Sequence, residues 1–63
     1  MDEDDKIIYN MFLGKRVHLV LKNSFHYTGT LKSINDAIIV LNDQKVGLMT
    51  ISIESIQSME EAQ

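Results

Sequence analysis

Apolar and polar residues alternate with a period of two from residue 16 to residue 32. Such alternation is typical of half-buried β-strands, whose successive side chains point to opposite faces. Asn23 and Ser24 interrupt it, although serine adopts a positive φ less readily than glycine and makes a weaker two-residue turn. The pattern predicts a hairpin of two strands, with Gly29 marking a bend or bulge in the second. The inward positions are Val17, Leu19, Leu21, Phe25, Tyr27, Gly29 and Leu31.

A second hairpin is predicted by a short apolar run with turn residues on both sides. Residues 38–41 are all apolar, and three of them are β-branched. Asn35 and Asp36 precede this run, and residues 42–44 (Asn-Asp-Gln) follow it. Because such residues favour turns, we expect a third strand that turns back into a fourth strand over residues 46–52.

The stretch TISIESIQSM, residues 50–59, fits two periods. Its apolar residues recur every three or four positions, as on one stripe of a helix, but Ile51 and Ile53 also alternate with polar neighbours, as in a strand. Ile and Thr favour strands over helices. We therefore expect two strands, about 46–52 and 54–59, with a sharp break at Ile53; a C-terminal helix is the alternative.

The N-terminal stretch changes period. Acidic residues begin it, and apolar residues then share one face at helical spacing up to Phe12, before Gly14. Acids suit a helix N-terminus, and glycine is a natural stop. We expect a short helix at about 3–12. Together with five antiparallel strands, it predicts a mainly β fold, a strongly bent small barrel of the SH3 type.

Length and composition limit what supports so small a core. Sixty-three residues form one domain at most, with a few kcal/mol of net stability. The chain has no cysteine, which excludes disulfides and thiolate zinc sites. His18 and His26 lie eight positions apart, with no carboxylate at a recognisable metal spacing, so no metal site or cofactor is predicted. Oligomerisation is the expected support.

The formal net charge of -3 conceals an uneven distribution. Acidic residues gather in tails at 1–5 and 60–63, whereas six Lys and Arg stand against three Asp and Glu in the domain, residues 6–59, which therefore carries +3. This charge permits nucleic-acid binding without requiring it; solubilising tails on an ordinary domain are the alternative. No apolar run approaches the roughly 20 residues of a membrane span, so a cytoplasmic protein without membrane contact is expected.

Three short patterns, taken in order, resemble the first signature of the Sm and Sm-like (LSm) proteins. They are Gly14-Lys15-x-Val17-x-Leu19-x-Leu21, Tyr27-x-Gly29-x-Leu31 and Val40-Leu41-x-Asp43. The segment ISIESIQSM resembles a degenerate second signature, with Ile56 and Met59 in the hydrophobic places. This resemblance covers about residues 6–59. It implies an N-terminal helix stacked on a five-stranded, strongly bent Sm-fold barrel.

The resemblance also implies a homo-oligomer. In the family, the fourth strand of one subunit pairs with the fifth strand of the next, and the subunits close into a ring. The open edges of a small barrel invite such strand addition. The apolar content of residues 46–59 exceeds the needs of so small a core, so part of it is expected to face a neighbour; the alternative is that all of it is core. Those residues are Val46, Leu48, Met49, Ile51, Ile53, Ile56 and Met59.

Sm-like rings commonly bind uridine-rich single-stranded RNA through two loops near the central pore. The first loop carries an Asp, a stacking residue and an Asn; the second carries Arg-Gly. Counted forward from Leu31, Asn35 stands at the Asp position; counted backward from Leu41, Ile38 stands at the Asn position, so this loop is one residue short. Residues 52–53, Ser-Ile, replace Arg-Gly. Ile53 resists positive φ, so the second bend must differ.

The usual uridine pocket is therefore not intact, but polar residues remain near it. Asn35, Asp36 and Ser52 are candidate RNA-binding residues that offer hydrogen bonds on the pore side, and Lys32 is a candidate phosphate contact. The alternatives are turn chemistry for the first three and a solvated side chain for the lysine. Further candidates for phosphate or base contact are Lys15, Arg16, His18 and His26.

Three functions remain open. The first is a homo-oligomeric Sm-like ring that binds single-stranded RNA, weakly or with altered base preference, in RNA processing. The second is the same ring as a protein-interaction scaffold without RNA. The third is a monomeric SH3-like adaptor, whose few aromatics argue against it. An enzyme is not expected, because no Ser/His/Asp arrangement, phosphate loop or apolar carboxylate pair is found.

Overall fold

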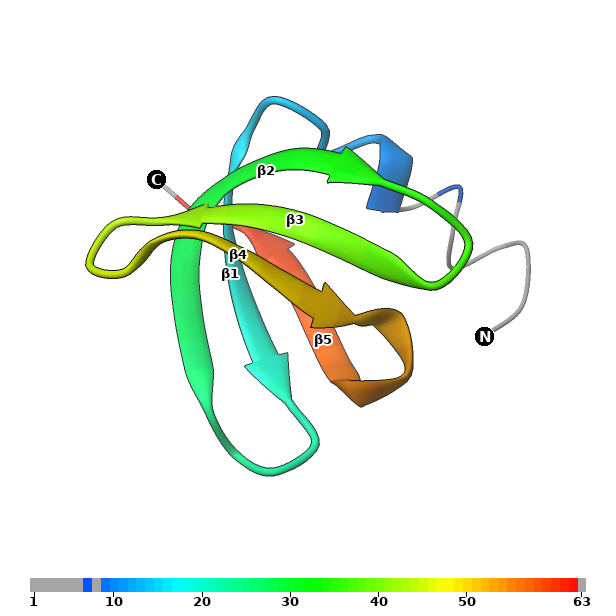
Figure 1. Ribbon diagram of the computed structural model, residues 1–63, viewed down its shortest axis with the longest axis vertical. Helices are drawn as coiled ribbons and strands as arrows, with labels where there is room; N and C mark the ends of the chain where they lie inside the picture. Colours follow the sequence, from blue (N-terminus) through cyan, green and yellow to red (C-terminus); the bar gives the residue numbers. More distant parts are fainter. Residues whose placement is uncertain (1–6, 8, 63) are drawn as a thin grey trace.

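The computed structural model describes residues 7 and 9–62, and these form one five-stranded antiparallel sheet (Figure 1). The strand order is β4-β3-β2-β1-β5. The mainly β architecture predicted from the alternation is confirmed. The strands are β1 (Arg16–Leu21), β2 (His26–Ile34), β3 (Ile38–Asp43), β4 (Gly47–Ser52) and β5 (Ile56–Glu61).

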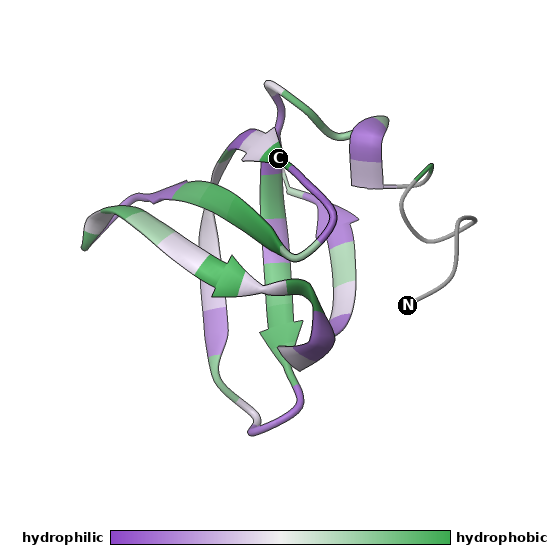
Figure 2. Ribbon diagram, turned by 45° about the vertical axis from the view of Figure 1, so that its right-hand side comes forward, coloured by the Kyte–Doolittle hydropathy of each residue, from purple (hydrophilic) through white to green (hydrophobic). Residues whose placement is uncertain are grey.

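One face of the curled sheet holds the core. Hydrophobic and hydrophilic bands alternate along β1 (Figure 2), as expected for a strand with one buried face. Val17 and Leu19 on this strand are fully buried, and so are Leu31 on β2 and Ile39 and Leu41 on β3. The rest of the core consists of Leu21, Ile51, Ile53 and Ile56, with Tyr9, Phe12, Tyr27, Ile34, Met49 and Met59 packed against it.

The long strand β2 bends around this core (Figure 1). Gly29 allows the bend because β3 passes close to it, and a Cβ at this position would collide with the Asn42 carbonyl oxygen. The bulge itself lies at Lys32, between the pairs Leu31↔Leu41 and Ser33↔Val40. The glycine therefore serves close backbone approach, and the extra residue sits three positions later.

The turn between β1 and β2 differs from the predicted two-residue turn. Leu21 N–H donates to the Phe25 carbonyl at 2.8 Å, so three residues connect the strands, and Ser24 takes a φ of 75°. Three-residue loops end in such a left-handed residue. Phe25 belongs to this end of the hairpin, beyond the reach of the core, and is 58% exposed. Its assignment to the inward set was wrong.

The predicted N-terminal helix, about residues 3–12, falls by half on residues 3–6 and 8, which lie outside the described part of the chain. Residues 7, 9 and 10 are helical, and residues 11–14 form turns. Gly14, at a φ of 79°, donates its N–H to the Leu31 carbonyl at 2.8 Å, which ties this segment to the middle of β2. No helix among the described residues is long and apolar enough to cross a membrane.

The C-terminal stretch forms two strands, as predicted, and the alternative of a C-terminal helix is wrong. A single 3-10 turn, Ile53–Ser55, separates β4 from β5. The first strand of this pair ends at Ser52, as expected, whereas β5 begins two residues later than predicted and continues through Glu60 and Glu61. A register shift between its Ile56 and Ser58 pairs accompanies the break in alternation.

Candidate functional site

Two of the four predicted RNA-binding residues come together at one end of β3. Asp36, in the loop between β2 and β3, and Ser52, at the end of β4, line a pocket of about 310 Å³. The strands bring them together because Ser52 is the direct partner of Ile38 across the β3–β4 ladder. We call this the loop pocket. Its lining is Asp36, Ala37, Ser52, Ile53 and Glu54.

The other two predicted residues lie outside this lining. Asn35 serves the turn: its side-chain Oδ1 accepts hydrogen bonds from the N–H groups of Ala37 and Ile38, both at 2.8 Å. This is the turn chemistry that was the alternative to an RNA role. Lys32 is exposed at the bulge in β2. Whether any of the four residues contacts RNA stays a prediction.

The bend at Ser52 and Ile53 is built without a left-handed residue. Ile53 is buried and begins the 3-10 turn, and its N–H donates to the Ala37 carbonyl at 2.9 Å. Ser52 has a φ of -65°, and its carbonyl accepts a hydrogen bond from Ser55 Oγ at 2.7 Å. Among the described residues Ser24 alone combines a side chain with positive φ. Ile53 therefore adopts no positive φ, as expected for a β-branched residue.

The chemistry of the loop pocket is acidic. Asp36 and Glu54 supply two carboxylates, whereas Ala37 and Ile53 supply apolar surface, and the lining contains neither an aromatic ring nor a cation. A nucleobase is usually held by stacking on a flat group, and a phosphate by a cation. This pocket offers hydrogen-bond acceptors and negative charge instead.

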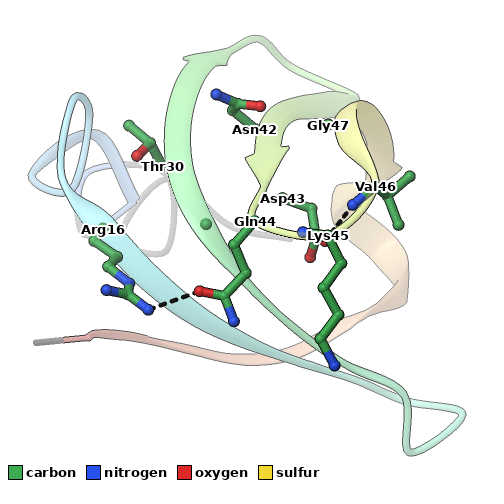
Figure 3. Close-up of a pocket in the computed structure, with 9 residues that line it drawn as sticks. Arg16, Thr30, Asn42, Asp43, Gln44, Lys45, Val46 and Gly47 are labelled. Atoms are coloured by element: carbon green, nitrogen blue, oxygen red, sulfur yellow. Dashed lines mark hydrogen bonds between the residues drawn. The ribbon is translucent and has the colours of Figure 1, made fainter.

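A larger recess lies at the opposite end of β3, around the turn between β3 and β4 (Figure 3). It has a volume of about 620 Å³, and we call it the turn pocket. Two cations line it, Arg16 at the start of β1 and Lys45 in the turn. The remaining lining is Gly29, Thr30, Asn42, Asp43, Gln44, Val46 and Gly47.

Asp43 fixes the turn that carries Lys45. Its side chain is buried, and Oδ1 accepts hydrogen bonds from the N–H groups of Lys45 at 2.8 Å and Val46 at 2.9 Å. The N–H groups of Val46 and Lys45 hold the pKa of the Asp43 carboxyl below its ordinary value of 3.8, although burial opposes them. The carboxylate is therefore charged at neutral pH and is satisfied by the backbone.

The two cations of the turn pocket present their charge to solvent. Arg16 Nη2 donates to Gln44 Oε1 at 2.7 Å, and the two side chains point toward one another across the recess (Figure 3). A guanidinium carries five N–H groups, so this bond leaves donors for an anion. Lys45 extends from the turn on the same side. The turn pocket can therefore bind phosphate oxygens, which the loop pocket cannot do as well.

Sequence reasoning found only part of the turn pocket. It named Lys15 and Arg16 as candidates for phosphate or base contact. The structure places Arg16 in the pocket, whereas Lys15 lies by Glu61, with its Nζ 3.8 Å from Glu61 Oε1. The contribution of Gln44 and Lys45 was missed. The signal available in the sequence was their position in a turn, directly after Asp43.

The two outermost strands of the sheet have no strand partner on their outer sides within the described residues. β4 pairs only with β3, and β5 pairs only with β1. Two large apolar side chains stand exposed on or beside β4: Val46 is 68% exposed and Leu48 is 69% exposed. The alternative that all the apolar residues of 46–59 belong to the core is therefore wrong, and contact of the exposed ones with a neighbouring subunit stays a prediction.

No protein-family model and no curated protein matches the sequence. Among solved structures, the chain is similar to a 1.55 Å crystal structure of the pleiotropic translational regulator Hfq, with a TM-score of 0.74 and 22% sequence identity, over 92% of this chain and 97% of that chain. Hfq has an Sm-like fold. The order of the strands, the bent β2 and the structural match together show that this chain has the Sm-like fold. This is the fold implied by the resemblance of its sequence to the Sm-like proteins.

Proposed function

We propose that the protein is a homo-oligomeric, ring-forming Sm-like protein that binds single-stranded RNA, weakly or with a base preference different from that of the uridine pocket. It is a binding module that carries out no chemistry. The single observation that supports this most is that β4 and β5 are edge strands of the sheet, each with one side unpaired among the described residues. The Hfq structure to which the chain is similar belongs to a translational regulator, which agrees with a role on RNA.

The open edge of β4 is suited to pairing with a second copy. Ile53 N–H donates to the Ala37 carbonyl, and this bond continues the β3–β4 ladder one residue beyond the pair of Ile38 and Ser52. Inward and outward N–H groups alternate along an antiparallel strand. The outward groups therefore belong to Ser52, Thr50 and Leu48. An edge of β5 from another subunit would satisfy them, and repeated head-to-tail pairing of this kind closes into a ring when the rotation permits.

Proline at position 50 tests this pairing. Thr50→Pro removes one outward N–H without removing an internal ladder bond, and proline is tolerated on an edge strand for this reason. The wild-type chain is expected to be a single oligomer by native mass spectrometry and light scattering, and Thr50→Pro is expected to shift it toward the monomer. Circular dichroism checks that the variant remains folded.

A second pair of variants controls for strain from the proline. Leu48→Lys places a charge on the β4 edge, whereas Phe25→Lys removes an apolar side chain of comparable exposure at the far β1–β2 turn. We expect only the first to dissociate the oligomer. A wild-type chain that stays folded and monomeric at micromolar concentration would contradict the proposed ring assembly.

RNA contact through the turn pocket is supported by its cations. Arg16 and Lys45 line one recess, and the acidic loop pocket lies at the other end of β3. In a ring each contact is repeated on every subunit, so weak individual contacts reinforce one another along one strand of RNA. Affinity would then come mainly from contacts to the RNA backbone, with little preference among the bases.

Fluorescence anisotropy with labelled oligo-U, oligo-A and mixed-sequence RNA at low salt measures this binding. Arg16→Ala and Lys45→Ala are each expected to weaken all three complexes. Each should also reduce the slope of log K against log salt by about 0.7 for every RNA phosphate that the variant no longer neutralises. Lys22→Ala, on the exposed β1–β2 turn, removes the same charge as a matched control and should change little. Absence of binding to all three RNAs by an intact ring would exclude the RNA function.

The loop pocket favours a second candidate function, a ring that acts as a protein-interaction scaffold without RNA. Its carboxylates, Asp36 and Glu54, repel phosphate and suit a basic peptide instead. Purification of the ring from cell extract, with and without nuclease, separates the two functions. Protein partners retained after nuclease treatment, with no RNA recovered before it, would support the scaffold.

A further inference from the structure

Two histidines meet on the outer face of the sheet. On β1, His18 pairs with Thr28 of β2, and Val20 pairs with His26, so the two histidines are diagonal neighbours on the same face. His18 Nε2 lies 3.2 Å from His26 Nδ1, and the ring centroids are 5.3 Å apart. His18 is half-buried and His26 is exposed. The hairpin has brought together two residues whose separation in sequence gave no sign of a shared site.

A neighbouring hydroxyl can select the tautomer of His18. Its Nδ1 lies 2.9 Å from Thr28 Oγ1. When Nδ1 carries the proton and donates to this hydroxyl, the lone pair is on Nε2, the nitrogen that faces His26. Metal-binding histidines commonly have their second nitrogen held in this way, which fixes both the tautomer and the orientation of the ring.

The separation of the two nitrogens matches that of two ligands on one metal ion. Zinc–nitrogen bonds are about 2.0–2.1 Å long, so two ligands at the tetrahedral angle lie about 3.3–3.4 Å apart. The observed 3.2 Å needs a small opening and a rotation of both rings that turns their lone pairs toward a common point. Exposed His26 can make most of this rotation.

The surroundings favour a cation without completing its coordination. Glu60 on β5 is the other cross-strand partner of His18 and shares its face. Among the described residues, no group of three or more His, Asp or Glu side chains is arranged to hold an ion. A bound metal would therefore have two protein nitrogens and open positions filled by water.

We propose that His18 and His26 form a two-histidine binding site for Zn²⁺ and for the similar imidazole-binding ions Ni²⁺ and Cu²⁺. The site depends neither on RNA binding nor on ring assembly, because all its residues belong to one subunit. It would hold the β1–β2 hairpin together on its outer face, with one site on each chain.

Titration of the untagged chain with ZnCl₂, monitored by isothermal titration calorimetry, tests the site. Wild type is expected to bind one Zn²⁺ per chain, and Mg²⁺, which prefers oxygen ligands, is expected not to bind there. His26→Gln changes an exposed residue at the start of β2 and is expected to weaken Zn²⁺ binding at least tenfold. Thr28→Val removes only the orienting hydroxyl and should weaken it about tenfold, whereas Lys22→Gln should have no effect.

Nuclear magnetic resonance places the ion. With substoichiometric Ni²⁺, line broadening is expected first at His18 and His26 and at their sheet neighbours. Broadening at the acidic N-terminus instead, no saturable Zn²⁺ binding, or Zn²⁺ binding unchanged by His26→Gln would each overturn the proposal. If His18→Gln fails to fold, the exposed His26 variant still decides it.

Discussion

The two ends of β3 carry opposite chemistry. At one end, the turn pocket has Arg16 and Lys45, and its only carboxylate is buried against backbone N–H groups. At the other end, the loop pocket has Asp36 and Glu54 and no cation in its lining. The resemblance to Sm-like proteins directs attention to the second end, but the charges favour the first for a polyanion. One strand therefore ends in two recesses of opposite charge within the same fold.

The two ends are also held by similar turns in different surroundings. Asp43 and Asn35 each accept two backbone N–H groups through one side-chain oxygen, at 2.8–2.9 Å. Asp43 is buried and charged, whereas Asn35 is exposed. Water can replace the bonds of Asn35 more easily than those of Asp43. The turn pocket should therefore be the more rigid of the two regions.

The largest effect is expected from Gly29→Ala, beneath the turn pocket. The new methyl would collide with the backbone of Asn42, which cannot move without separating β2 from β3. We expect the free energy of unfolding to fall by about 3 kcal/mol, measured by urea denaturation. Gly47→Ala meets no atom within 4 Å but has a φ of 93°, so it should cost only about 1–2 kcal/mol. Equal losses would show that space at Gly29 is not the constraint.

A smaller effect is expected from removing the turn oxygens. Asp43→Ala should lower the free energy of unfolding, and with it the melting temperature, more than Asn35→Ala does. For Asn35→Ala we expect a loss of about 1 kcal/mol in the free energy of unfolding. Asp43→Asn keeps an acceptor oxygen and should lie between wild type and Asp43→Ala. If the Asn35 variant were the less stable one, the assignment of the rigid end would be reversed.

Acid should affect the two turns differently. Because the folded-state pKa of Asp43 is below 3.8, its charged form stabilises the fold. This contribution is complete above the pKa of the unfolded chain and is lost as the pH falls through the lower, folded-state pKa. Urea midpoints of wild type should therefore decline through this acid range more steeply than those of Asp43→Asn. If the urea midpoints of the two proteins declined in parallel with falling pH, protonation of Asp43 would not be the cause of the decline.

The smallest effect concerns RNA affinity at the loop pocket. Replacing Asp36 with Asn and Glu54 with Gln in one chain removes two repulsive charges and should raise RNA affinity about twofold for each charge at low salt. The single variants Asp36→Asn and Glu54→Gln show whether each of the two charges contributes. A loss of affinity in the double variant, measured by anisotropy, would instead make these carboxylates RNA ligands.

Much of the strand pattern could be predicted from residue periodicity. The alternation around Leu19 and Leu31 identified buried positions, and the slip at Ile53 identified the break before β5. Phe25 was misassigned because alternation does not reveal where the barrel ends and solvent begins. The bulge at Lys32 was missed because one extra residue in a polar stretch leaves no mark on the apolar pattern.

The sequence by itself determined the strands, their inward faces and the resemblance to the Sm-like family, because these depend on local alternation and on short spacings. Only the tertiary structure placed Arg16 beside Gln44 and His18 beside His26. Each of these pairs joins different strands or loops, and their contacts are set by ladder register and by the curvature of β2. A one-residue change in register would move each side chain to the other face, so residue spacing along the chain cannot specify such pairs.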